Sequence, residues 1–117
     1  MQKEEKKILN FLDTLNAYCI FVGAKSFNVS LEKNKKEWKI SVKSDFLKSH
    51  AKGINELENR INNVKCDHTE EMYYAFIGGE DFKDDHDIDV IACMIDEAKV
   101  NVIENTFEAT FIRKINK

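Results

Sequence analysis

The chain has 117 residues, a length that suits one domain with a single hydrophobic core. Hydrophobic residues make up 43% of it and charged residues 33%, which excludes a disordered chain and predicts an ordinary globular protein. The net charge of −3 argues against a nucleic-acid-binding domain, which usually carries a basic excess, and the apolar stretches fall far short of the roughly 20 residues that cross a bilayer.

The three cysteines and the placement of charge narrow the class further. Cys19, Cys66 and Cys93 are odd in number, widely spaced and form no C-x-x-C pair, which is typical of free thiols in a reducing compartment and predicts a cytoplasmic protein. Residues 33–52 carry seven lysines against two carboxylates, whereas residues 67–89 carry nine carboxylates against one lysine. Two solvated faces of opposite sign explain this segregation, and so does a surface that steers a protein partner.

An amphipathic helix is predicted from about Glu4 to Tyr18. Its apolar residues recur at intervals of three and four positions and so share one face: Ile8, Phe11, Leu12, Leu15 and Cys19. Gly23 follows a short apolar extension of this pattern and is a natural helix stop.

A β-hairpin follows, with strands at Phe27–Leu31 and Trp38–Val42. Apolar and polar residues alternate along both strands, which predicts a sheet with one covered face and one wet face. The loop at Lys33–Lys36 contains Asn34, which can adopt the positive φ that tight turns require.

A second helix is predicted to start at Ser44 or Asp45, either of which can act as its N-cap, and to run to about Asn63. Its apolar positions form a narrow seam: Leu47, Ile54, Leu57, Ile61 and Val64. His50 also lies in this seam, where a lone histidine is most often a packed residue, so we assign it no function.

The second half of the chain begins with a predicted strand at Met72–Ile77 and an acidic loop at Glu80–His86. Residues 88–98 contain an unbroken apolar run that suits either a helix or a strand. We favour a helix, because the apolar residues form one stripe and the aspartates around its start complement the positive end of a helix dipole.

A closing hairpin is predicted at Val100–Ile103 and Phe107–Ile112, with its turn near Asn105 and the valines facing the phenylalanines. A helix that feeds a β-hairpin therefore occurs twice, once near each end of the chain.

No complete catalytic, metal or phosphate motif accompanies these elements. Asp85-His86-Asp87-Ile88-Asp89 has the alternating oxygens that open a calcium loop, but Val90 and Asp96 stand where an EF-hand requires glycine and glutamate. These aspartates are therefore interpreted as a helix-start feature.

Cys66 and His68 provide two zinc ligands where a site requires four, or three and a water. We accordingly predict no metal, no cofactor and no catalytic residue.

The order helix, hairpin, helix-containing middle, helix, hairpin resembles that of the GHKL (Bergerat-type) ATP-binding domain of histidine kinases and anti-sigma-factor kinases. In the first helix, Asn16-Ala17 matches the asparagine and alanine with which that family holds magnesium. Asp45 lies near the place of the family's adenine-reading aspartate. The resemblance covers roughly residues 8–115 and implies Asn16 and Asp45 as weak candidates for a nucleotide site.

The chain departs from that family at three places. Leu12 stands where the family has a glutamate, and Phe46 replaces a glycine. Residues 84–89 are acidic where a glycine-rich turn should present backbone N–H groups to phosphates. Carboxylates there would repel a triphosphate, so the resemblance implies a degenerate domain that does not bind ATP. An unrelated α+β layer of the roadblock or secretion-chaperone type is the alternative fold.

These features predict one two-layer α+β domain over residues 1–117, with a mainly antiparallel sheet of about five strands and three helices on one face. The predicted function is non-catalytic: a cytoplasmic regulatory or scaffolding protein that binds another protein or, weakly, a second copy of itself, and neither nucleic acid nor membrane. Its candidate partner surface comprises four lysines of the first hairpin: Lys33, Lys35, Lys36 and Lys39. The alternative is a sensor domain that binds a small molecule or nucleotide without catalysis.

Overall fold

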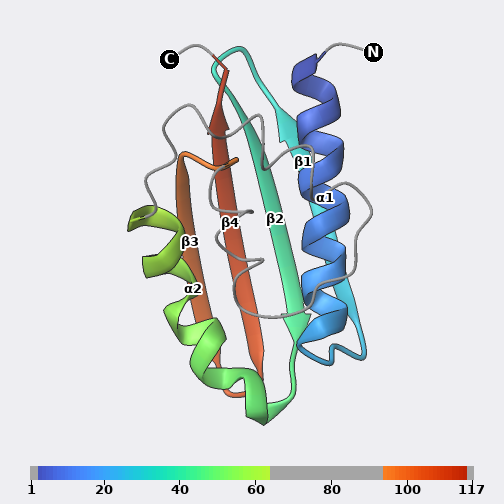
Figure 1. The fold of residues 1–117 in the computed structure, drawn as a ribbon, viewed down its shortest axis with the longest axis vertical. Coiled ribbons are helices and arrows are strands. Elements are labelled where there is room, and N and C mark those ends of the chain that lie inside the picture. The colour runs from blue at the N-terminus through green and yellow to red at the C-terminus, as the bar shows by residue number, and fades with distance from the viewer. Residues whose placement is uncertain (1–2, 64–93, 116–117) are drawn as a thin grey trace.

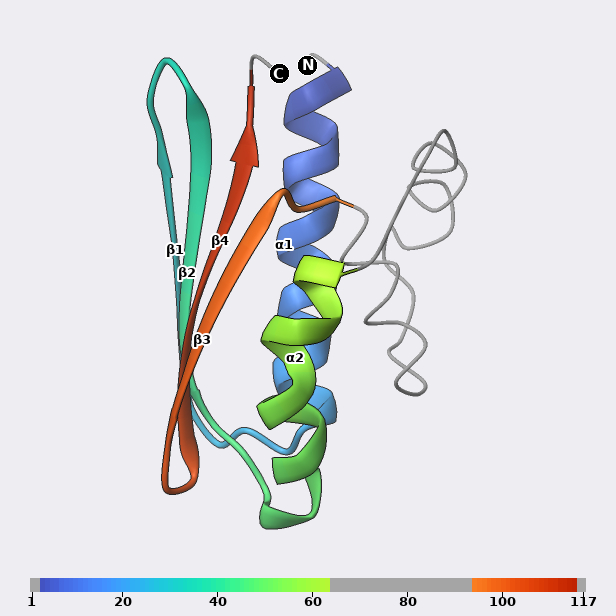
Figure 2. The same ribbon diagram turned by 90° about the vertical axis from the view of Figure 1, so that its left-hand side faces the viewer.

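A computed structural model describes residues 3–63 and 94–115, which fold into a sheet covered on one face by helices (Figures 1 and 2). The elements in chain order are α1 (Lys3–Phe21), β1 (Phe27–Lys33), β2 (Glu37–Asp45), the 3-10 turn η1 (Lys48–His50), α2 (Ala51–Asn63), β3 (Glu97–Ile103) and β4 (Thr106–Lys114). The predicted two-layer α+β class is confirmed. The described residues hold four strands and two α-helices, fewer than the five and three expected, and the predicted strand at 72–77 lies outside them.

The four strands pair antiparallel in the order β1-β2-β4-β3, so β2 and β4 are central and β1 and β3 are the edges. In Figure 1, α1 runs along the β1 side of the sheet and α2 along the β3 side. Each half of the domain is therefore a helix with a hairpin, and the halves join where β2 pairs with β4. This is the arrangement that the sequence shows twice, although α2, not residues 88–98, is the described helix of the second half.

The first helix ends as its glycine predicts. Gly23 has a φ of +82°, its N–H donates to the carbonyl of Ile20, and the N–H of Ala24 donates to that of Cys19. These two bonds form the Schellman motif, in which glycine takes the left-handed position after the last helical turn. A Cβ on Gly23 would stand 2.5 Å from the Leu47 side chain, so both the backbone and the space favour glycine.

The second helix starts later than predicted. Strand β2 continues through Asp45, and the chain turns only at Lys48–His50 before α2 begins. Leu47 stands at the N-cap position of η1 in an extended conformation without a side-chain capping bond. Neither Ser44 nor Asp45 caps the helix, because strand pairing with Phe107 and Thr106 of β4 captures both residues.

The helix predicted over residues 88–98 is wrong in its described part. Met94 and Ile95 are buried in a turn, and β3 begins at Glu97. The alternation of Ala98, Val100 and Val102, each opposite an inward residue of β4, prevails over the helical stripe. Residues 88–93 lie outside the described part. The closing hairpin itself is confirmed.

The core lies between the sheet and the helices. Phe11 of α1 and Phe111 of β4 meet edge to face with ring centroids 5.4 Å apart, and Tyr18 meets Phe107 in the same way at 6.4 Å. These rings are almost fully buried and connect the first helix to the second hairpin. The two halves therefore share one hydrophobic core.

Candidate functional site

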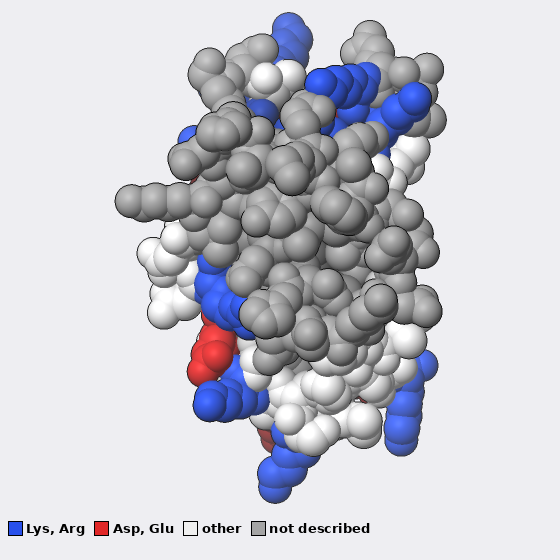
Figure 3. All heavy atoms as spheres, viewed as in Figure 1, with Lys and Arg blue, Asp and Glu red and all other residues white. Residues whose placement is uncertain are grey.

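The turn between β1 and β2 carries most of the candidate partner surface. We call it the lysine hairpin, defined by Lys33, Lys35, Lys36 and Lys39. Lys35 and Lys36 are exposed at the turn itself. Figure 3 shows Lys and Arg side chains at the end of the molecule where α1 begins and this hairpin turns, and others at the opposite end.

Asn34 holds this turn through its side chain. Its Oδ1 accepts hydrogen bonds from the N–H of Lys36 at 2.8 Å and of Glu37 at 2.9 Å, and its own N–H donates to the Glu37 carbonyl at 3.0 Å. Asn34 does not use the positive φ that it can adopt: among the described non-glycine residues Glu104 alone has one, in the β3–β4 turn. An asparagine can close a turn through its amide oxygen without a left-handed backbone.

A fourth bond anchors the turn to the sheet's other half. The N–H of Ile115, just past β4, donates to the carbonyl of Lys36 at 2.8 Å. The backbone around the exposed lysines is thus fixed by four hydrogen bonds from two segments of the chain.

Strand alternation divides the four lysines. Lys33 lies on the helix side with its Nζ 4.7 Å from the ring centroid of Trp38, a cation–π contact. Lys39 lies on the open face, directly opposite Glu32. The predicted surface is therefore not one flat patch: Lys35 and Lys36 form its tip, and the other two flank it on opposite faces.

Trp38 beneath Lys33 is buried, and none of the described residues accepts a hydrogen bond from its indole N–H. A buried donor without an acceptor costs stability, and such costs are commonly found at functional sites. The face of this ring lies against the Lys33 ammonium group.

Arg113 is a further residue beside the lysine hairpin, and it was not among the residues predicted from the sequence. It is 5% exposed, its Nε pairs with the carboxylate of Glu4, and its Nη1 donates to the Met94 carbonyl at 2.7 Å. It ties the start of α1 to the end of β4 beside the lysine hairpin. The signal was present in the sequence, since Arg113 stands at an inward position after Phe107, Ala109 and Phe111.

The structure places the two nucleotide-site candidates, Asn16 and Asp45, in different settings. Asn16 is exposed on α1. Asp45 accepts hydrogen bonds at Oδ1 from the N–H of Lys25 at 2.8 Å and of Ser26 at 3.2 Å. These bonds, that from Ser26 first, lower the pKa of the Asp45 carboxyl. Asp45 therefore tethers the loop between α1 and β1.

Cys19 and His50 are packing residues in this structure. Burial raises the pKa of the Cys19 thiol to about 11, and its hydrogen bond with Ser44 offsets this only in part. Such a thiol is almost entirely protonated at neutral pH and is a poor nucleophile. The His50 ring packs against Phe21 at 4.9 Å.

In residues 3–63 and 94–115 no three side chains of the His, Cys, Asp or Glu type gather as a metal site would require. The aspartates at 85, 87 and 89, together with Cys66, His68 and Cys93, lie outside these ranges.

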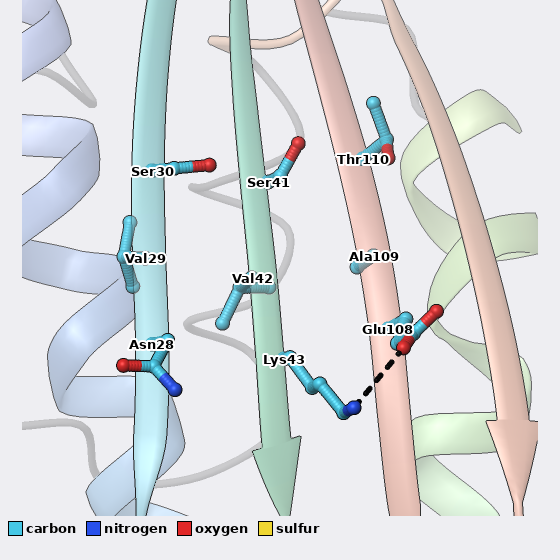
Figure 4. A pocket seen from close by; sticks show the side chains of 9 residues that line it. All are labelled: Asn28, Val29, Ser30, Ser41, Val42, Lys43, Glu108, Ala109 and Thr110. Atoms are coloured by element: carbon cyan, nitrogen blue, oxygen red, sulfur yellow. Dashed lines mark ion pairs between the residues drawn. The ribbon is translucent and has the colours of Figure 1, made fainter.

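The open face of the sheet holds a shallow depression of about 360 Å³ that the sequence did not reveal as a unit (Figure 4). Ser30, Ser41 and Thr110 form one row of hydroxyls across β1, β2 and β4. Beside them Lys43 and Glu108 pair at 3.6 Å, both largely exposed, so the ion pair adds little stability. This surface therefore combines a row of hydroxyls with an exposed ion pair.

Comparison with known proteins found no family model, no curated protein and no solved structure that matches this chain. Among the helices in the described part of the chain, none is both long enough and apolar enough to cross a membrane.

Proposed function

We propose that this protein is a non-catalytic regulatory or scaffolding protein that acts by binding another protein, with the lysine hairpin as its contact surface. The observation that carries the proposal is the set of four hydrogen bonds around Asn34 and Lys36. A turn fixed in advance loses little conformational entropy on binding, so its lysines are preorganised for a contact.

The chemistry of the hairpin favours an acidic partner. Lys35 and Lys36 crowd like charges at a protruding tip, which speeds encounter with a surface of opposite sign. The acidic segment 67–89 of a second copy is one source of that surface, which gives weak self-association. The buried Cys19 thiol suits a reducing setting, so the proposal includes the cytoplasm.

The resemblance to a degenerate GHKL domain is part of this proposal, without nucleotide binding. The proposed lack of nucleotide binding is supported by Asp45, because its carboxylate already accepts hydrogen bonds from the N–H groups of Lys25 and Ser26. A ligand that binds only the native state raises the melting temperature. Because this protein is proposed not to bind ATP, ATP with magnesium is expected to leave its melting temperature unchanged. A saturable rise would favour the alternative, a nucleotide sensor.

The main experiment measures association kinetics with a partner that the immobilised protein captures from a lysate of its source cells. The association rate constant is expected to fall as salt rises, since the Debye length shortens from about 10 Å at 0.1 M to about 3 Å at 1 M. The double variant Lys35→Glu/Lys36→Glu should slow association by roughly tenfold and change dissociation less.

The matched control is Lys48→Glu/Lys52→Glu, which makes the same charge change at η1 and α2, away from the hairpin. It is expected to slow association much less. An equal effect would show that net charge, not the hairpin, drives encounter. An association rate that ignores both salt and the Lys35/Lys36 reversal would contradict the proposal, and a monomer by sedimentation at every salt concentration would remove self-association.

A further inference from the structure

The two edges of the sheet differ in whether their backbone groups are satisfied. At the β3 edge, the Asn62 side chain of α2 donates to the Ala98 carbonyl at 2.9 Å and accepts from the Ala98 N–H at 2.8 Å. Glu58 accepts from the N–H of Val100 at 2.6 Å. The amide of Asn62 thus makes the pair of bonds that a neighbouring strand would make, and α2 closes this edge.

At the β1 edge the corresponding groups point away from the sheet. Asn34 and Glu37 form a hydrogen-bonded pair, and antiparallel pairs alternate between bonded and non-bonded. The residues whose N–H and C=O face outward are therefore Phe27, Val29, Leu31 and Lys33. No described residue donates to or accepts from these groups.

The side chains beside this edge suit an added strand. Phe27 and Val29 are partly buried on the helix side, and Leu31 next to them is 41% exposed. An incoming strand would place alternate side chains on this side, where an apolar residue opposite Leu31 removes that exposed surface from water.

Charge discriminates between two candidate occupants of this edge: the β1 strand of a second copy and an acidic segment of another protein. Residues 25–36 carry four lysines and one glutamate, and Glu32 already faces Lys39. Pairing of two copies through β1 (Phe27–Lys33) would bring a second set of these four lysines to the same edge. Like charges brought close together across paired strands are destabilising. The edge is therefore unsuited to a second copy of itself.

We infer that the β1 edge binds an extended acidic peptide segment of another protein by strand addition, antiparallel to β1, with its acidic N-terminal part beside Lys33, Lys35 and Lys36. The inference rests on the proposed function and specifies its binding mode. Main-chain bonds at the outward groups supply the register, and the lysine hairpin selects the charge.

The test uses a synthetic peptide with three acidic residues followed by alternating threonine and valine, and the protein variant Leu31→Pro. Proline at this position removes an outward N–H while leaving the bonds between β1 and β2 intact, which edge strands tolerate. Leu31→Ala is the matched control, because it trims the side chain to a similar extent and keeps the N–H.

Binding of the peptide is expected to weaken by roughly tenfold in Leu31→Pro beyond the loss in Leu31→Ala, since a main-chain hydrogen bond and strand register are lost. Circular dichroism checks that the variant is folded, and Val29→Pro serves as a second edge block if it is not. In the wild-type complex, the amides of Val29 and Leu31 should become protected from hydrogen exchange.

Any of three results would overturn the inference. The peptide fails to bind, its neutral analogue with asparagine and glutamine binds equally well, or Leu31→Pro and Val29→Pro leave its binding unchanged. Protection of the same amides at high protein concentration without peptide would instead assign the edge to a second copy. If Lys35→Glu/Lys36→Glu slows association with the lysate partner while the edge variants do not, the proposed function stands and strand addition fails.

Discussion

At one edge of the sheet, two side chains of α2 bond the backbone groups of β3. At the other, no described residue bonds the outward backbone groups of β1, which lie beside the lysine hairpin. Each edge belongs to a unit of one helix and one hairpin, but of the described helices only α2 donates side-chain hydrogen bonds to, and accepts them from, the edge strand of its unit. Helix α2 lies close enough to β3 for Asn62 to act as a surrogate strand. Unpaired edges invite aggregation, and proteins usually block them. The fold thus closes one edge and places lysines beside the other, and the proposed partner contact lies at this second edge.

The largest expected effect concerns whether the two halves are one unit. Phe111→Ala removes the ring that joins β4 to Phe11 of α1, and should lower the free energy of unfolding by about 3–5 kcal/mol. Because both halves share this core, denaturant titration followed by Trp38 fluorescence and by circular dichroism should still give coincident transitions. Separate transitions would mean that the halves fold independently and that their edges must be compared as parts of two units.

The second-largest effect on stability is expected from a variant that opens the closed β3 edge. Asn62→Ala leaves the Ala98 N–H and C=O without their partner, which should cost about 1–3 kcal/mol of unfolding free energy and increase aggregation. Asn63→Ala is the control, because the Asn63 amide donates to Asn59 of its own helix and not to the sheet. It should change stability by less than about 0.5 kcal/mol. Equal effects of the two variants would refute the surrogate-strand role.

A smaller effect concerns the loop that leads into the open edge. The Ser26 and Lys25 N–H groups lower the pKa of Asp45 from its ordinary value of 3.8, so its carboxylate stabilises the fold above that pH. This contribution is lost as pH falls through the lowered pKa. The melting temperature of the wild type should therefore exceed that of Asp45→Asn at pH 7, and the difference between the two melting temperatures should close below pH 3.8. Asp13→Asn, which changes an exposed carboxylate of α1, is the control; a gap independent of pH would contradict the tether.

The smallest effect on stability is expected at the lysine hairpin. Lys35→Glu/Lys36→Glu changes exposed side chains and leaves the bonds of Asn34 in place, so the free energy of unfolding should move by no more than about 0.5 kcal/mol. Chemical denaturation measures this directly. A larger loss would indicate a structural role for these lysines and would weaken the proposal that they serve a partner.

Local patterns predicted the parts of the fold that local chemistry decides. The stripe of α1, the stop at Gly23 and the alternation of both hairpins follow from side-chain periodicity and backbone freedom. The start of α2 and the fate of residues 94–98 do not, because pairing with β4 takes precedence over capping and helical spacing.

The site divides in the same way. The lysines were visible in the sequence, but their separation onto two faces follows from the strand register. The open and closed edges could not be predicted, because they depend on Asn62 reaching Ala98 across 36 positions of the chain. Arg113 could have been found, since a charged residue in the apolar phase of a strand indicates a buried partner.

The difference between the edges is tested most directly by amide hydrogen exchange of the free protein, residue by residue. The amides of Val29 and Leu31 should exchange near the rate of an unstructured peptide, because their N–H groups point away from the sheet and no described residue accepts from them. Those of Ala98 and Val100, bonded to Asn62 and Glu58, should exchange far more slowly. Strong protection at Val29 and Leu31, or equal rates at the two edges, would contradict the account.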